Sequence, residues 1–579
     1  MEDFRYEFKD VAGMPVVKAF QEEDKSGTAW SLKLLSAAFK GRRNIEEYVA
    51  TVGREFQNPL PEKSPAEVVS LLAAMDFTKI LAYYLPETGP MVDGGRPESI
   101  ADYLVPYRTD PVPDDATRFV SADAEEQDLA FAEGYLAGLD PTVLHRVTAK
   151  AGEREACLSL EELLSKIPLT DAGLPGVFRG ETLQDLTAAR RLYYVDYSGM
   201  ADLEDGVHPW KDTPKYIYAP LAVFALDGKN RLRPVAIQTG PDSSYALFTP
   251  ADGYGWLIAR TILQAATGSH HEMISHLAHT HLVLEAFAVC TKRNLDEGHA
   301  VRRLLDPHFD GTFPINYLAV NKLIRPGEAV DRLVGSAMDS NYSYISRHRL
   351  AFDFRQSLPP AQIAGRGVSP EEAAMAYPYR DDALLVWDAL LQWTTAYTAN
   401  HYGDDAAVAA DDHLQAWLHD LATHGKIRGL TLADSGGIST RQELTEILAG
   451  VIFIAGPQHA AVNFSQITNG TFIPLANLAG YRPAPRKKQA DYSLQDWLDF
   501  LPPLDVALMQ QSRLTFLSRV RHTRLGHYGF GYFSGADRRA QLRFLRRLRR
   551  VERDLRSRNE QGTPYVHLLP SRIPQSTNI

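Results

Sequence analysis

The hydrophobic pattern is densest in two stretches of the chain. Between Trp256 and Leu295 there is no proline, and apolar residues recur so closely that they predict one long, largely buried helix. The run ILAGVIFIAG at 447–456 is apolar on all sides but shorter than the roughly 20 residues of a membrane-spanning helix, so it predicts a buried helix. This second helix leads into His459 and Asn463.

Less dense patterns predict further helices. The segment 64–85 has apolar residues at helical spacing, and Ser64 followed by Glu67 has the spacing of a capping box. More amphipathic helix is expected between 400 and 450, with an interruption at the serine- and glycine-rich residues 435–439. Helices therefore make up most of the predicted elements.

Two segments predict non-helical structure. The polar, proline-rich span 105–118 predicts an extended connector. The segment 216–239 alternates aromatic and β-branched residues around Asp227-Gly228, which indicates a β-hairpin. The sequence thus predicts a small β-element in a mainly helical chain.

The segment 538–558 predicts an amphipathic basic helix. It contains ten arginines, interleaved with Leu542, Phe544, Leu545, Leu548, Val551 and Leu555. Such a helix can bind nucleic acid or an anionic membrane, but a solvated basic face above a packed apolar stripe is the commoner arrangement. We interpret it in the second way, as a helix that supports the end of the chain at Ile579.

The composition narrows the class of protein. The chain has 579 residues, 45% of them hydrophobic, so it can bury a large core, and its length alone suggests roughly two to four domains. The net charge of -11 disfavours wholesale nucleic-acid binding. Only Cys157 and Cys290 are present, which argues against a disulfide framework. The first residues, MEDFRYEFKD, lack the apolar segment of a secretory signal, so a cytoplasmic location is expected.

Histidines gather around the predicted buried helices. Seven of the 18 lie between residues 270 and 308, among them those at 271, 276, 281, 299 and 308. His459 and Asn463 are four residues apart on the second helix, and the sequence ends at Ile579 with a carboxylate. Neutral imidazoles with one or two oxygen donors and an open position suit redox iron.

The five-residue spacing of His276 and His281 predicts a local distortion. In an α-helix, five residues rotate a side chain by about 140° from its starting direction, so these two rings would not converge. A π-type turn would place both on one side of the helix, and such turns concentrate at functional sites. His459 and Asn463 need no distortion, because an ordinary α-turn aligns residues four apart.

Spacing alone leaves alternatives open. A single buried histidine is more often a hydrogen-bonded core residue, and loosely spaced histidines can form a surface cluster. Zinc is the main rival metal, although an amide oxygen and a chain terminus are unusual zinc ligands.

Several segments together resemble the lipoxygenase family, whose members oxygenate polyunsaturated fatty acids at a non-haem iron. WLIAR at 256–260 is similar to the start of the family's iron-bearing helix, with Arg260 where lysine is usual. YAPLAVFALDGKNRLRPVAIQ at 218–238 is similar to its short strands. HAAVN at 459–463 and the terminal Ile579 follow in the order typical of the family.

The resemblance implies a mainly α fold. We expect a large lipoxygenase-type catalytic domain over residues 116–579, with long central helices, a π-helical turn at the metal site and a small β-sheet subdomain. Residues 1–115 are expected to form an N-terminal helical segment packed on or covering the pocket. No N-terminal β-barrel of the PLAT or C2 type is expected, as in compact bacterial lipoxygenases.

The resemblance also implies site residues. One iron, cycling between Fe2+ and Fe3+, would be bound by His276, His281, His459, Asn463 and the carboxylate of Ile579. Gln466 and His271 would lie behind these ligands, with Gln466 hydrogen-bonded to Asn463 and orienting it. His299 and His308 match the motif without being ligands. The substrate pocket would include Ala319, Leu323 and Ile324.

The implied function is insertion of O2 into the cis,cis-1,4-pentadiene unit of linoleate, α-linolenate or arachidonate. An iron-bound hydroxide would remove the hydrogen, and alanine at 319 implies S-configured hydroperoxides. A monomer is expected, with no nucleic acid and at most peripheral membrane contact. The rival hypotheses are a histidine-rich zinc hydrolase and a non-enzymatic protein that uses the basic helix to bind lipid or nucleic acid, for which steep salt dependence without turnover would be expected.

Overall fold

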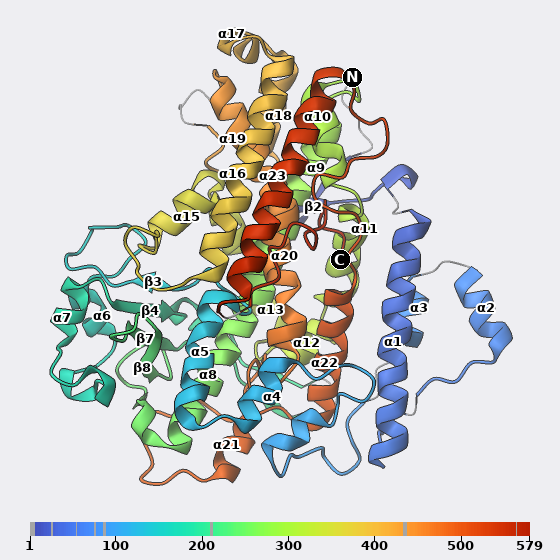
Figure 1. The fold of residues 1–579 in the computed structure, drawn as a ribbon. Coiled ribbons are helices and arrows are strands. Elements are labelled where there is room, and N and C mark those ends of the chain that lie inside the picture. The colour runs from blue at the N-terminus through green and yellow to red at the C-terminus, as the bar shows by residue number, and fades with distance from the viewer. Residues whose placement is uncertain are drawn as a thin grey trace.

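Helices form most of the described chain. The computed structural model describes residues 6–579 except 25–26, 54, 59, 74–76, 85–88, 209–211, 432–436 and 563. Figure 1 shows helices around two central ones, with a small sheet to one side. This arrangement agrees with the mainly α fold expected from the sequence.

Two long helices run through the core and contact each other. The first central helix joins α8 (Tyr254–His270), the π-helix η7 (His271–His281) and α9 (Leu282–Asn294). The second begins with α19 (Arg441–Phe453) and contains α20 (His459–Asn463). The long helix predicted at 256–295 and the buried helix predicted at 447–456 are both confirmed.

Both central helices would be long enough and apolar enough to cross a membrane, judged by length and hydropathy alone. In each helix, however, 94% of the most apolar stretch of 18 residues is buried inside the protein. The second continues from Arg441 to Gly470, well beyond the apolar run seen in the sequence. These helices are therefore the core around which the other helices pack.

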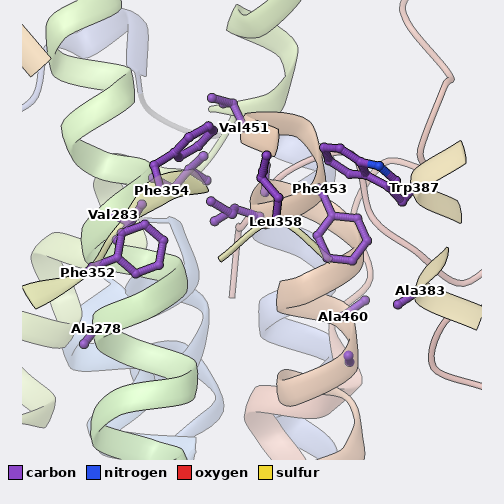
Figure 2. Packing of buried hydrophobic residues seen from close by; sticks show 14 of the residues in the cluster. Ala278, Val283, Phe352, Phe354, Leu358, Ala383, Trp387, Val451, Phe453 and Ala460 are labelled. Carbon is purple, nitrogen blue, oxygen red and sulfur yellow. The ribbon is translucent and has the colours of Figure 1, made fainter. Parts of the chain in front are cut away.

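An apolar layer joins the two central helices. Figure 2 shows Phe354 and Leu358 between the helix that bears Val283 and the helix that bears Val451. At Gly450 of α19, a Cβ atom would lie 2.5 Å from Phe354 Cζ and 2.6 Å from Leu358 Cδ2. The missing side chain lets this layer approach α19 closely, which fixes the distance between the helices.

Shorter helices surround this core. α16 (Pro378–His401) packs against α19 and against α23 (Gly535–Asn559). α18 (Asp412–Thr423) packs against α9, and α22 (Leu504–Arg519) packs against α1 (Thr28–Val52). The helices predicted between 400 and 450 are confirmed as α18 and α19, while part of the interruption expected at 435–439 lies outside the described residues.

The basic segment forms the predicted amphipathic helix, α23. Its apolar residues Phe544, Leu548, Val551 and Leu555 are buried. The Arg547 guanidinium lies 2.8 Å from a carboxylate oxygen of Asp388 on α16, so arginine contacts also attach this helix to the core.

The β-hairpin is confirmed within a five-stranded sheet of order β3-β4-β7-β8-β9, whose neighbours are all antiparallel. The strands are β3 (His145–Arg146), β4 (Leu192–Asp196), β7 (Leu221–Leu226), β8 (Leu232–Gln238) and β9 (Leu247–Phe248). β7 and β8 form the hairpin, and Oδ1 of Asp227 accepts hydrogen bonds from the backbone N–H groups of Lys229 and Arg231. An aspartate at the turn thus closes it as expected.

The helical pattern predicted near the N-terminus is confirmed. The segment 64–85 contains two helices, α2 (Pro65–Ala73) and α3 (Phe77–Tyr84), and residues 74–76 between them are outside the described chain. The capping box is confirmed, because the Glu67 N–H donates to Ser64 Oγ and Glu67 Oε2 accepts from the Ser64 N–H.

The predicted connector at 105–118 is wrong in its second half. Residues 114–121 form helix α4 (Asp114–Ser121). The carboxylates of Asp114 and Asp115 lie in its first turn, where they interact favourably with the positive end of the helix dipole. The domain boundary predicted at residue 115 stays a prediction.

Candidate metal centre

The two central helices bring three predicted histidines together in the core. A ligand atom of each of His276, His281 and His459 lies within 4.8 Å of one in the other two rings, and all three side chains are buried. The Nε2 atoms of His276 and His281 are 3.3 Å apart. The ring centroids of the three pairs lie 4.9, 5.4 and 5.0 Å apart.

The predicted π-type distortion is present and longer than expected. η7 is π-helical from His271 to His281, so it begins five residues before His276. Backbone hydrogen bonds in a π-helix join residues five apart. His276 and His281 therefore lie on the same side of the helix. This local geometry is what allows the two Nε2 atoms to approach each other.

The second central helix presents His459 and Asn463 from an α-helical turn, as predicted. π-turns flank α20 on both sides, η10 (Ile454–Gln458) before it and η11 (Gln466–Gly470) after it. Pro457 lies inside η10. Proline lacks an N–H and clashes with the preceding turn, so it accounts for the distortion before His459.

The carboxyl end of the chain reaches the same place. The backbone oxygen of Ile579 lies 3.1 Å from Nε2 of His459, and the Ile579 residue is only 1% exposed. Residues 573–579 are all buried. This contact places Ile579 beside the three imidazoles, and the role of its carboxylate as a ligand stays a prediction.

Hydrogen bonds hold this C-terminal tail in place. Nδ1 of His308 lies 2.7 Å from the Gln575 carbonyl oxygen, and the indole N–H of Trp30 donates to the Asn578 carbonyl oxygen at 2.7 Å. At Gly456 a Cβ atom would lie 2.8 Å from the Pro574 carbonyl oxygen. The tail therefore passes directly against η10, where a side chain would exclude it.

The remaining motif histidines have other partners. Nε2 of His271 lies 2.8 Å from the Val462 carbonyl oxygen and so links the two central helices. His299 accepts a hydrogen bond from the Val301 N–H at the start of a helix. His308 binds the tail, as described above. These three rings thus have structural contacts in the described chain.

Burial keeps the clustered imidazoles neutral. Burial, with the neighbouring His276 as a second cause, lowers the pKa of His281 to about 3. Burial also lowers the pKa of His276, and it lowers that of His459 well below the ordinary value. Neutral imidazole is the form that binds a metal ion.

Asn316 fixes the tautomer of His281. Nδ1 of His281 lies 2.7 Å from Asn316 Oδ1, while the Asn316 amide N–H donates to the His281 carbonyl oxygen at 2.9 Å. The second bond orients the amide, so Oδ1 accepts from Nδ1–H and leaves the Nε2 lone pair toward the cluster. Sequence reasoning missed Asn316, because no spacing rule connects it with a histidine 35 residues earlier.

Glu272 and Gln466 lie behind His276. Oε2 of Glu272 is 3.5 Å from His276 Nδ1, and Nε2 of Gln466 is 3.2 Å from the same atom. Burial would raise the pKa of Glu272, but hydrogen bonds with His271 and His276 outweigh it and bring the pKa to about 2. A four-residue spacing before His276 could have indicated Glu272, which the sequence analysis missed.

The Gln466 amide also lies where the resemblance implies. Its Nε2 is 3.4 Å from Asn463 Oδ1, and the Asn463 amide nitrogen is 3.3 Å from the Leu517 carbonyl oxygen. These contacts orient the Asn463 amide from both ends. Its role as a metal ligand stays a prediction.

The donor set fits a first-row metal ion. The three neutral imidazoles, with the predicted carboxylate of Ile579 and amide oxygen of Asn463, would give five nitrogen and oxygen donors without a thiolate. Structural zinc sites are almost always four-coordinate, whereas a larger nitrogen and oxygen set with an open position suits iron. The buried donors therefore fit iron better than zinc.

Of the predicted pocket residues, Ala319 and Leu323 lie in another π-turn, η9 (Ala319–Leu323), and Ile324 follows it directly. Ala319 and Ile324 are buried, and Leu323 is half-buried. η9 follows α11 (Thr312–Leu318), the helix that bears Asn316. The assignment of these residues to a substrate pocket stays a prediction.

Comparison with known proteins identifies the family. A sequence model described as lipoxygenase matches residues 111–561. The chain belongs to the lipoxygenase family. Lipoxygenases are dioxygenases, so the chain is assigned to that class of oxidoreductases. The zinc hydrolase and the non-enzymatic basic-helix protein are not favoured.

Individual lipoxygenases show how far the similarity extends. The chain is 38% identical to linoleate 9/13-lipoxygenase of Pseudomonas aeruginosa, over 79% of this chain and 67% of that protein. It is 29% identical to the allene oxide synthase-lipoxygenase protein of Plexaura homomalla, over 79% of this chain and 44% of that protein. The matched region thus spans 44% to 67% of these relatives.

Solved lipoxygenase structures have the same fold. A lipoxygenase variant crystallised in complex with arachidonate superimposes with a TM-score of 0.81 at 24% sequence identity, covering 100% of this chain and 80% of that one. At this identity the match establishes the fold, including the mainly α architecture.

Proposed function

We propose that this chain is a non-haem iron dioxygenase that inserts O2 into the cis,cis-1,4-pentadiene units of polyunsaturated fatty acids. The observation that supports this most is the meeting of His276, His281 and His459 with the carboxyl end of the chain in one buried place. The relative from Pseudomonas aeruginosa is named for linoleate, which makes linoleate the first substrate to test.

The proposed iron ligands are His276, His281, His459, Asn463 and the terminal carboxylate of Ile579. Bound iron would supply the one-electron redox chemistry needed to remove a hydrogen atom from the doubly allylic carbon. The chain's own part is to hold neutral imidazoles with their tautomers fixed, and to exclude bulk water from the centre. Gln466 and His271 are proposed to hold the ligand-bearing segments in the positions that metal binding requires.

We further propose that Ala319, Leu323 and Ile324 line the fatty-acid pocket and that the product is the S-hydroperoxide. The basis is Ala319, since alanine at this position of the family pattern goes with S products. Chiral chromatography of the product from linoleate tests this part. A predominantly R product would overturn the stereochemical proposal without affecting the oxygenation chemistry.

The direct test is turnover of linoleate by purified, iron-loaded protein. Conjugated-diene absorbance and oxygen uptake should rise together in equal molar amounts. His276→Ala is the control, and it should lose both signals together with its iron. If fully iron-loaded wild-type protein gave neither signal with linoleate, α-linolenate or arachidonate, the proposed function would be wrong.

A further inference from the structure

The outer side of α23 bears a straight row of arginines. They are Arg539, Arg543, Arg546, Arg550 and Arg553, spaced by four, three, four and three residues, and all five are exposed. At about 100° per residue, they fall within an arc of about 80° and extend over about 21 Å of helix. We call these five residues the arginine row. Figure 1 shows α23 in red at the front of the molecule.

The arginine row points away from the core. The buried residues Phe544, Leu548, Val551 and Leu555 occupy directions about 150° away on the same helix. These four residues belong to the buried core, and α23 packs against α16. The row is free to contact something outside the molecule.

Three of the five other arginines on α23 have acidic partners, and the arginines of the row have none among the described residues. Arg547 pairs with Asp388, Arg556 with Glu552, and Arg558 with Asp382. Among the residues that the structure describes, none forms an ion pair or hydrogen bond with a guanidinium group of the row. Like charges three and four residues apart destabilise a helix, so five of them without partners indicate a requirement other than folding.

Two exposed apolar residues lie on α23 or in the loop that leads into it. Phe530 is 108% exposed and lies between Gly529 and Gly531, in the loop that leads into α23. That loop contacts the buried side of the helix, where the amide N–H of the buried Gln541 donates to the Gly526 carbonyl oxygen at 2.9 Å. Leu542, which is 37% exposed, lies about 60° from Arg539 around the helix.

We propose that the arginine row, with Phe530, docks the protein on an anionic lipid bilayer. A bilayer surface offers many anionic headgroups to a straight row, and an interior for an aromatic side chain at its end. Nucleic acid or an acidic protein would account for the arginines but not for a fully exposed phenylalanine in the loop that leads into their helix. Because the chain as a whole has a net charge of -11, the row also orients the molecule with this side toward the membrane.

This inference goes beyond the proposed oxygenation and is tested without substrate. Full-length protein is mixed with vesicles of phosphatidylcholine alone or with added phosphatidylglycerol, and the bound fraction is measured by flotation. Binding should need the anionic lipid and should fall as salt rises, because salt screens these charges.

Two variants locate the contact. Arg543→Gln, Arg546→Gln and Arg550→Gln together should weaken binding to anionic vesicles on the order of a hundredfold. Phe530→Ser should weaken it less and leave its salt dependence unchanged. The matched control combines Arg43→Gln, Arg179→Gln and Lys229→Gln, which removes the same charge from exposed positions elsewhere and should bind like wild type.

Several results would overturn the proposal. Equal binding by wild type and the arginine variant would do so, as would equal losses in the arginine variant and the control. Binding that ignores the anionic lipid, or tighter binding to an oligonucleotide than to anionic vesicles, would also contradict it. Turnover of detergent-solubilised linoleate should be the same in all these proteins, so failure of docking is distinguishable from failure of the proposed function.

Discussion

The three clustered histidines differ in how their second ring nitrogen is held. Nδ1 of His281 has one amide partner, Asn316, at 2.7 Å. Nδ1 of His276 lies near both Glu272 and Gln466. Nδ1 of His459 has no hydrogen-bond partner among the described residues. His281 is therefore the ring whose orientation depends most clearly on a single neighbouring side chain.

Replacing Asn316 with alanine should weaken metal binding. The Asn316→Ala variant loses the acceptor that fixes the His281 tautomer, so iron affinity should fall about 10- to 100-fold. Competition with a chelator measures this affinity. Asn321→Ala, a half-buried asparagine five residues later whose amide donates to the Tyr317 carbonyl oxygen, is the control and should keep wild-type affinity. An Asn316→Ala variant with unchanged affinity would show that other contacts orient His281.

At the residue scale, the sequence predicts the histidines and not their partners. The spacing of His276 and His281, five residues apart, and of His459 and Asn463, four apart, is visible in the linear order. Asn316 becomes a partner only through the packing of α11 against α9. Such contacts depend on distances between helices, which hydrophobic periodicity does not specify.

Among the elements, the π-turns determine the site. The sequence predicts one distortion between 276 and 281, since two rings five apart cannot otherwise converge. It does not predict η9, η10 or η11, because no pair of chemically distinctive residues has an unusual spacing there. Among these three π-turns, η10 alone contains a residue, Pro457, from which the distortion could be recognised in the sequence.

Helix α1 covers the tail that ends at Ile579. Trp30 and Leu34 of α1 belong to the same buried apolar cluster as Ile579. The sequence predicts helical structure near the N-terminus over the pocket, but not that α1 would bond to the last residues of the chain. That contact joins residues 548 positions apart.

Trp30→Phe should loosen the tail. It removes the indole N–H and leaves the buried Asn578 carbonyl oxygen without that donor, at a cost of about 1–3 kcal/mol. Release of iron to a chelator should be faster than in wild type. Trp497→Phe removes a similar buried hydrogen bond to Thr261 elsewhere, so it should lower stability without changing iron release. Equal release rates in both variants would contradict a specific role for α1.

The antiparallel hairpin at residues 8–17, which begins with β1 (Phe8–Val11), is attached to the first central helix by a buried acid. The Val17 N–H on β2 (Met14–Val17) donates to Glu285 Oε1 at 2.6 Å, and burial raises the pKa of Glu285 to about 7. A raised acid pKa means that the folded state holds the proton longer than the unfolded state. The contribution of protonated Glu285 to the stability of the fold is therefore fully present below pH 4.5, and it is lost as the pH rises to about 7.

Glu285→Gln should therefore stabilise the protein at pH 8 relative to wild type, by on the order of 1–3 kcal/mol, and much less at pH 5. Glutamine keeps the acceptor for Val17 and never ionises. The measurement is the difference in melting temperature between the two proteins at each pH, in which contributions from histidines cancel. A difference that does not change with pH would contradict a raised pKa at Glu285.

For the whole molecule, the sequence predicts the core and the sheet better than the surrounding arrangement. The two central helices follow from dense apolar residues, and the β7–β8 hairpin follows from alternation around a turn. The division of segment 64–85 into two helices and the early start of α4 depend on local capping and tertiary contacts. Dense burial patterns thus specify which elements form the core but not how shorter helices close around it.

The central claim is that both central helices and the chain terminus bind one iron. The most direct measurement is a crystal structure of iron-loaded protein with anomalous diffraction recorded at the iron edge. We predict a single anomalous peak within bonding distance of Nε2 of His276, His281 and His459 and of a carboxylate oxygen of Ile579. An iron peak elsewhere, or those side chains turned away from a common point, would contradict the account.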